Sequence, residues 1–176
     1  MATALTEHFQ MLARYNTLAN QALFEACGAL NDEEREKDRP GSFRSIHRTL
    51  NHILLGDRIW MERFTGGGAT TPPLDTILHA SFPPLRAARE VEDSRIEGFM
   101  ATATDRFLTQ KFRYVNNRGN IHVDPASVVV AHFFNHQTHH RGQVHVMLSQ
   151  AAVPPPSLDM HRLIRPHAAV PVQSRS

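Results

Sequence analysis

The sequence is organised around a histidine-rich stretch, HFFNHQTHHRGQVH, which runs from His132 to His145. It lies within a longer helical pattern over residues 126–150. His132, His136 and His140 recur every fourth residue, so on a helix they share one stripe with successive side chains roughly 40° apart. Two imidazoles one turn apart can bind the same metal ion. The pair His136/His140 is therefore the leading candidate for a metal site, although such pairs are more often surface or core residues.

Three more helices are indicated by apolar residues that recur at three- and four-residue steps. They are expected over residues 4–27, from a cap at Ser42 or Ser45 to about Phe64, and over about 85–103. The third is more charged and less sharply patterned than the others. The stretch 70–84 is rich in proline and threonine, so it is interpreted as a connection between the second and third helices.

A short β segment is expected before the last helix. Two β-prone runs within residues 112–123 flank a turn-rich segment, Asn116–Asn120, and this pattern is typical of a hairpin or a loose ribbon. Asp124 and Pro125 then predict the start of the last helix, with the aspartate as N-cap and the proline in the first turn. Such a ribbon could cover the mouth of a site built on that helix.

These elements predict an all-α protein, namely a four-helix bundle with a short β-hairpin or ribbon before its last helix. A chain of 176 residues is long enough for one domain with a substantial core. We expect that domain over residues 1–160 and an irregular C-terminal tail over residues 161–176. Bundles commonly build metal sites in their cores from side chains on facing helices.

The composition excludes several function classes. The formal net charge is only +2 and no run of lysine or arginine occurs, so no nucleic-acid partner is expected. No secretory signal is recognised, and no apolar stretch approaches the ~20 residues of a membrane span, so no membrane association is expected either. The single cysteine, Cys27, excludes an internal disulfide and fits a reducing compartment. A cytoplasmic protein is therefore expected.

A metal site needs a third ligand from a facing helix, and the second helix offers His47 and His52. His52 lies among apolar neighbours, with Gly56 one turn later on the same face, where the missing side chain leaves space beyond the imidazole. His47 is roughly 140° from His52 around the helix and should face elsewhere. Taken alone, His52 is more readily interpreted as a core histidine that is hydrogen-bonded to a neighbour.

Motifs in three of the helices resemble those of the DinB/YfiT-like family, a group of bundle proteins regarded as metal-dependent enzymes. The motifs are Tyr15-Asn16…Ala19-Asn20, Leu50-Asn51-His52…Asp57…Trp60, and Asn135-His136-Gln137-Thr138-His139-His140-Arg141-Gly142-Gln143. The last is the most specific, and the order and spacing agree over about residues 5–160. In that family one histidine of the second helix and two of the last helix hold the metal, which implies His52, His136 and His140 here.

Three neutral imidazoles leave an open coordination position on a divalent ion, as in catalytic rather than structural zinc sites. Zinc is the first expectation, and nickel and ferrous iron are alternatives because both also accept imidazole. No general base is identified. Gln137 follows His136 where zinc proteases place a glutamate, and Asp57 should point about 140° away from His52.

The residues beside this triad are assigned less direct roles. His132 is one turn before His136, and a polar core position at the end of the bundle is favoured over a metal contact or a hydrogen bond to a ligand. His139 is expected at the rim of the site. Gln143, one turn after His140, could accept an imidazole N–H or hold a bound water.

Other polar and aromatic residues are assigned to the bundle interior. Asn16 lies on the apolar stripe of the first helix, so it is expected to be a partly buried amide that needs partners. Arg141 points about 100° away from His140 and is expected to form an ion pair between helices. Trp60 and Phe133 lie on apolar faces and are expected in the core rather than in contact with a substrate.

Two functional hypotheses follow. The resemblance implies thiol-handling enzymes, so the first is a metal-dependent transferase, possibly a thiol S-transferase, or a hydrolase that acts on a small molecule with a low-molecular-weight thiol as a possible cosubstrate. The second is a non-catalytic metal-binding, sensing or stress-response protein in which the metal is structural. Either is compatible with the homodimer that we expect, since many bundles self-associate.

Overall fold

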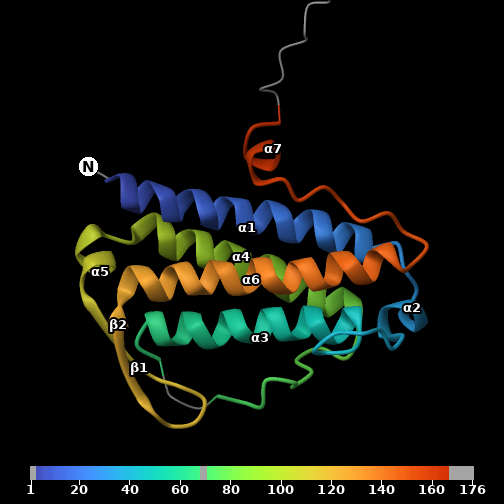
Figure 1. The fold of residues 1–176 in the computed structure, drawn as a ribbon, viewed down its shortest axis with the longest axis horizontal. Helices are drawn as coiled ribbons and strands as arrows, with labels where there is room; N and C mark the ends of the chain where they lie inside the picture. The colour runs from blue at the N-terminus through green and yellow to red at the C-terminus, as the bar shows by residue number, and fades with distance from the viewer. Residues whose placement is uncertain (1–2, 68–70, 167–176) are drawn as a thin grey trace, which may run out of the picture.

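Four long helices form the body of the molecule (Figure 1). The computed structural model describes residues 3–67 and 71–166. The long helices are α1 (Ala4–Gly28), α3 (Ile46–Phe64), α4 (Phe82–Thr102) and α6 (Ala126–Ser149).

The helices are arranged as a bundle in which each packs against two others. α1 packs against α4 and α6, and α3 packs against the same two helices. α1 and α6 run in one direction and α3 and α4 in the other, so the long connection after α3 brings the chain back to the start of α4 (Figure 1). The predicted four-helix bundle is confirmed.

Short elements fill the connections between the long helices. They are α2 (Asp32–Glu36), α5 (Asp105–Thr109), β1 (Lys111–Val115), β2 (Ile121–Pro125) and α7 (Met160–Ile164). β1 and β2 pair in antiparallel register with Tyr114 opposite His122, which confirms the predicted hairpin. The sequence does not predict α5 or α7. Residues 167–176 of the predicted tail lie outside the described residues.

One predicted helix start and one predicted N-cap are wrong. α4 begins at Phe82 rather than near Leu85, because the prolines that follow Phe82 fall in the first turn, where the backbone N–H groups have no intrahelical partner to lose. α6 begins at Ala126, and Asp124 is not its N-cap. Asp124 lies in β2 instead, where it accepts a hydrogen bond of 3.1 Å from the Tyr114 hydroxyl.

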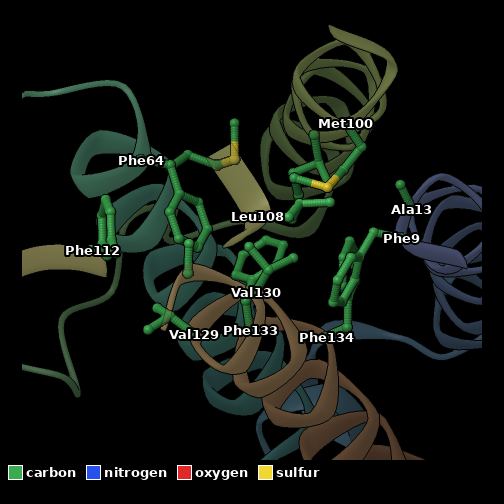
Figure 2. Packing of buried hydrophobic residues seen from close by; sticks show 13 residues of the cluster. Phe9, Ala13, Phe64, Met100, Leu108, Phe112, Val129, Val130, Phe133 and Phe134 are labelled. Carbon is green, nitrogen blue, oxygen red and sulfur yellow. The ribbon is translucent and has the colours of Figure 1, made fainter. Parts of the chain in front are cut away.

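The apolar core is divided into two clusters, one toward each end of the bundle. Figure 2 shows the cluster near the hairpin, where side chains from all four long helices meet. The Phe64 ring of α3 lies with its centroid 5.8 Å from that of Phe133 of α6, in an edge-to-face arrangement. Such aromatic pairs stabilise a core beyond the area that they bury.

Between these clusters lies a layer of buried polar side chains from all four long helices. Its members are Asn16, Asn20, Asp57, Arg89, Asp93, Gln137 and Arg141. Arg89 of α4 donates to Asp57 Oδ2 of α3, and its Nη2 lies 3.0 Å from Asp93 Oδ1. Burial raises the pKa of Asp57 to about 7 and that of Asp93 to about 6, and the guanidinium only partly offsets this effect. Asp57 thus pairs with Arg89 between α3 and α4 in the bundle interior.

Arg141 enters the same layer from α6, but its partners differ from those predicted. Its Nη1 donates to the side-chain oxygens of Asn16 and Asn20, and both asparagines in turn donate to Asp93 Oδ1, at 3.2 and 2.9 Å. The predicted direct ion pair is therefore wrong, because two amides lie between the cation and the carboxylate. The predicted burial of Asn16 is confirmed.

Three further findings concern buried or apolar residues. Cys27 is fully buried, and burial raises the pKa of its thiol to about 12, so the thiol stays protonated and packs as a small apolar group. Phe133 is buried, and Trp60 is partly buried against the same cluster. Among the described residues, no helix has the length and apolarity that crossing a membrane requires.

Candidate metal centre

The structure brings His52 of α3 together with His136 and His140 of α6. The Nε2 atoms of His52 and His140 are 3.2 Å apart, and those of His140 and His136 are 3.1 Å apart. One nitrogen from each ring lies within 4.8 Å of the other two. Zinc–nitrogen bonds of about 2.0–2.1 Å at tetrahedral angles place two ligand nitrogens about 3.3 Å apart, which is close to the two short separations. The three rings could therefore hold one metal ion.

The hydrogen bonds of the outer ring nitrogens fix where two of the imidazoles carry their protons. His52 Nδ1 lies 2.9 Å from the Leu74 carbonyl oxygen, and His140 Nδ1 lies 2.8 Å from Gln143 Oε1. Both oxygens only accept, so both Nδ1 atoms must donate. In the neutral rings the two Nε2 atoms then present bare lone pairs to each other at 3.2 Å, an arrangement that a cation between them would stabilise.

Burial keeps the three rings neutral. It is the largest cause that lowers the pKa of each histidine, to about 3 for His136 and about 4 for His140, with the same direction for His52. Repulsion from the neighbouring rings lowers the pKa of His136 and His140 further. Because a metal binds only the unprotonated nitrogen, these shifts favour metal binding at neutral pH.

Two neighbours shape the space around the triad. Phe43, in the loop before α3, stacks on His52 with 3.8 Å between ring centroids and meets His140 edge-on at 5.6 Å. Gly56 faces His136, and a Cβ atom at this position would lie only 3.1 Å from His136 Cε1. The glycine, which costs about 1 kcal/mol of helix propensity relative to alanine, therefore makes room for the third imidazole.

The structure also places the three residues assigned to the surroundings of the triad. Gln143 makes the predicted contact with an imidazole N–H, that of His140. His139 is exposed beside the site, and its Nε2 lies 3.2 Å from Gln143 Nε2. The expectation of a core position for His132 is wrong, since this residue is exposed with its ring 5.6 Å from Trp60. A helical stripe that starts in the core can reach solvent where the bundle ends.

Replacing Gln143 with leucine is expected to weaken metal binding by about 10- to 100-fold, a typical effect of losing a partner that orients a ligand. The leucine cannot accept the His140 Nδ1–H, so nothing fixes the ring with Nε2 toward its two partners. Competition titration with a colorimetric chelator measures the affinity. Gln150→Leu is the matched control, because Gln150 is exposed at the C-terminal end of α6. Equal losses of metal affinity in both variants would contradict the orienting role of Gln143.

A cleft of about 540 Å³ opens beside the triad, with His52, Gly56 and His136 on one side. The other side is formed by the hairpin, including Tyr114 and His122. The predicted position of the ribbon next to the site is therefore confirmed. The cleft gives a small molecule room to approach the point at which the three imidazoles meet.

Sequence reasoning missed several parts of this site. Phe43 and the Leu74 carbonyl belong to irregular segments, whose backbone path no periodic pattern reveals. Arg63 and Arg118 line the same cleft from α3 and from the hairpin turn. The position of Arg63 was the one available signal, since eleven residues separate it from His52 on the same helix and eleven residues complete slightly more than three turns.

Comparison with known proteins agrees with the architecture and with the motifs. The sequence model of the DinB family matches residues 1–173. The chain is 30% identical to Protein DinB of Bacillus subtilis (strain 168) over 149 residues, a match that covers 80% of this chain and 84% of that protein. A crystal structure of a DinB-like protein from Bacillus cereus ATCC 10987 has the same fold, with a TM-score of 0.61 at 22% identity over 80% of this chain and 91% of that one. The chain belongs to the DinB family.

Proposed function

We propose that this protein binds one divalent metal ion through His52, His136 and His140 and uses it to act on a small molecule. The observation that carries the proposal is the pair of bare Nε2 lone pairs, on His52 and His140, that face each other at 3.2 Å while both outer nitrogens donate elsewhere. A core histidine that served packing alone would turn a donor toward an acceptor. A cation held among the three rings would remove the repulsion between them.

The residues present fit a catalytic rather than a closed metal site. Three neutral ligands leave the ion its full charge, and a bound ion of this kind lowers the pKa of a coordinated water or thiol and polarises a substrate. Zinc is the preferred metal, with nickel and ferrous iron as alternatives, since all three accept imidazole. Phe43 covers one side of the His52 ring, and the cleft admits the substrate at the other side.

The reaction that we propose is a transfer, with a low-molecular-weight thiol as one reactant, or a hydrolysis. The chain belongs to the DinB family, and the resemblance of its motifs to that family implies thiol-handling enzymes, which supports this choice. The chain would contribute by orienting the ligands and by binding the substrate in the cleft. A thiol needs no separate base once it is bound to the ion, because coordination itself releases the proton.

A second candidate function is a non-catalytic one, in which the metal serves stability or sensing. One observation favours it, since the described residues that line the cleft include no aspartate or glutamate to act as a general base. The two candidates differ in the fourth coordination position. A catalytic ion exchanges a ligand there, whereas a structural ion does not.

Cobalt(II) replacement tests both points in one experiment. The protein, prepared without a His tag or chelators, is loaded with Co²⁺, and its visible spectrum is recorded before and after addition of 2-mercaptoethanol. We expect one equivalent of bound metal and a new thiolate-to-cobalt charge-transfer band. One equivalent without any spectral response to thiol would favour the structural role. No bound metal, even after reconstitution at neutral pH, would rule out both.

Bound metal is expected to resist mild acid. Protons compete for the ligand nitrogens only near the pKa values of the folded, metal-free protein, about 3 for His136 and about 4 for His140. Retention should therefore be nearly complete at pH 6, where ordinary histidines already take up protons, and should fall as the pH drops below about 5. Dialysis over this pH range followed by elemental analysis measures retention. Half-release near pH 6.5 would show that the rings are not desolvated as described.

A further inference from the structure

The cleft beside the triad carries positive charge. Arg63 and Arg118 line it together with several asparagines, and its described lining residues include no carboxylate. In the part of the chain that the structure describes, neither arginine forms an ion pair. This differs from the other arginines of α3 and α4 near it, such as Arg58 and Arg95, which both pair with Glu92.

Arg63 is held in a defined orientation. Its guanidinium carbon lies 4.6 Å from the centre of the Trp60 ring and 5.6 Å from that of Tyr114. Its Nη2 donates a hydrogen bond of 2.7 Å to Asn117 Oδ1 of the hairpin turn. A guanidinium fixed by aromatic faces still has in-plane N–H donors, and their fork matches the two oxygens of a carboxylate.

The hairpin turn that carries Arg118 is also organised in advance. Asn116 Oδ1 accepts the backbone N–H groups of Arg118 and Asn120, each at 2.9 Å, and Gly119 adopts the positive φ of 80° that the turn requires. Because these bonds fix the amide, Asn116 Nδ2 must be the donor in its 2.9 Å contact with His122 Nε2. The neutral His122 ring then carries its proton on Nδ1, so the contact fixes the tautomer of a ring that lines the cleft.

The separation between Arg63 and His52 along α3 sets the length of a ligand that reaches both. Arg63 follows His52 by eleven residues, so it lies about 20° away around α3 and about 16 Å further along the axis. Gly56 and Trp60 occupy the same face between them and line the cleft too. Helical side chains lean toward the N-terminus, so Arg63 reaches back toward His52 and shortens the gap. A ligand that spans it must be several bonds long.

We infer that this cleft binds a carboxylate at the far end of an elongated substrate whose near end reaches the metal. Arg63 and Arg118 recognise the carboxylate. The hairpin holds Arg63 through Asn117 and carries Arg118 in its turn. The inference rests on the proposed function for the metal end only. It assigns the substrate class: a small carboxylate in which the metal-binding atom and the anionic group are separated by several bonds.

Two probes that differ only at the far end test this assignment, namely 6-mercaptohexanoate and 6-mercaptohexan-1-ol. Titration calorimetry on the zinc-loaded protein gives both dissociation constants, and their ratio cancels the shared thiol–metal contribution. We expect the carboxylate to bind about 10-fold tighter, the scale of one good charge-assisted interaction. Arg63→Gln and Arg118→Gln should each lower this ratio, and the double variant should bring it to about 1, with zinc content unchanged.

Arg48→Gln is the matched control, because Arg48 is an exposed residue in the first turn of α3, away from the cleft. It removes one positive charge from the same helix and should leave the ratio as in the unmodified protein. Arg63→Lys keeps the charge but not the fork, and it should recover only part of the preference. If Arg48→Gln lowered the carboxylate preference as much as Arg63→Gln does, the preference would reflect net charge alone, and the assignment would be overturned.

The remaining outcomes separate this inference from the proposed function. If the unmodified protein binds zinc but binds the two thiol probes equally well, the carboxylate subsite is overturned and the metal centre is not. If no zinc binds, the proposed function is wrong. The arginines are then tested on the metal-free protein by titration with hexanoate and with hexan-1-ol, and the position of the Arg63 Nε–Hε signal in nitrogen-15 spectra is the readout. A shift with hexanoate alone would support the subsite, and no shift with either would overturn it.

Discussion

The His136→Ala variant is expected to lose metal affinity by more than about 100-fold. Loss of a residue that only orients a ligand can cost up to about 100-fold, and here a ligand itself is removed. Two imidazoles would remain, those of His52 and His140, and two nitrogens hold a divalent ion far less firmly than three. Elemental analysis of protein purified at neutral pH gives the metal content. The unmodified chain should hold about one equivalent and the variant almost none.

The control for this variant is His139→Ala. His139 is exposed, adjacent in sequence to His140, and outside the group of three nitrogens that lie within 4.8 Å of one another. Its removal also lowers the histidine content by one, so it corrects for metal bound loosely at the surface. Full metal content in His139→Ala together with loss in His136→Ala is the expected pattern. Equal retention in both variants would exclude the triad as the metal site.

Replacing Arg89 with methionine is expected to destabilise the fold by about 3–5 kcal/mol, the usual cost of removing one partner from a buried ion pair. The methionine keeps most of the volume but leaves the Asp57 and Asp93 carboxylates without their shared cation. Urea unfolding measures the change in the free energy of unfolding. Arg86→Met, which removes an exposed partner of Glu90 on the same helix, should cost no more than about 0.5 kcal/mol.

The cost of Arg89→Met should also depend on pH. Burial already raises the pKa of both aspartates in the folded protein, and losing the cation raises it further. A carboxyl group with a raised folded-state pKa is stable in its protonated form, so its stabilising contribution is lost as the pH rises through that pKa. The variant should thus lose more stability at pH 8 than at pH 5. A cost that does not change with pH would show that the aspartates are not desolvated.

Much of the fold could be predicted because apolar residues recur at helical spacing on the buried faces of most of its long helices. The apolar spacing gave the bounds of α1 and α6 and the end of α3 to within one or two residues of those observed. α4 was the exception, because prolines occupy its first turn and because its apolar pattern is weak. Arg89, Glu92 and Asp93 point inward there, so charged residues occupy positions that a periodicity argument assigns to solvent.

The candidate site was predictable where it depended on helix geometry. Residues at i and i+4 share a face on any helix, so His136 and His140 could be paired from spacing alone. The third ligand, His52, could be named only through the resemblance to the DinB/YfiT-like family. Helix angles predicted only that His47 faces elsewhere, and its ring does turn away, with Nε2 2.8 Å from the His79 carbonyl oxygen. Contacts from loops could not be found in this way, since their paths are set by tertiary packing rather than by local pattern.

The division of the triad between two helices has a consequence for the order of events in the cell. His52 and His140 are 88 positions apart, and α6 is the last of the long helices to leave the ribosome. A complete site cannot exist until α6 has docked against α3, so capture of the proposed metal would come after these two helices have packed together and could not start the folding of the chain. Pulse-labelled chains that are released before α6 is made should remain metal-free, however much metal the cell contains.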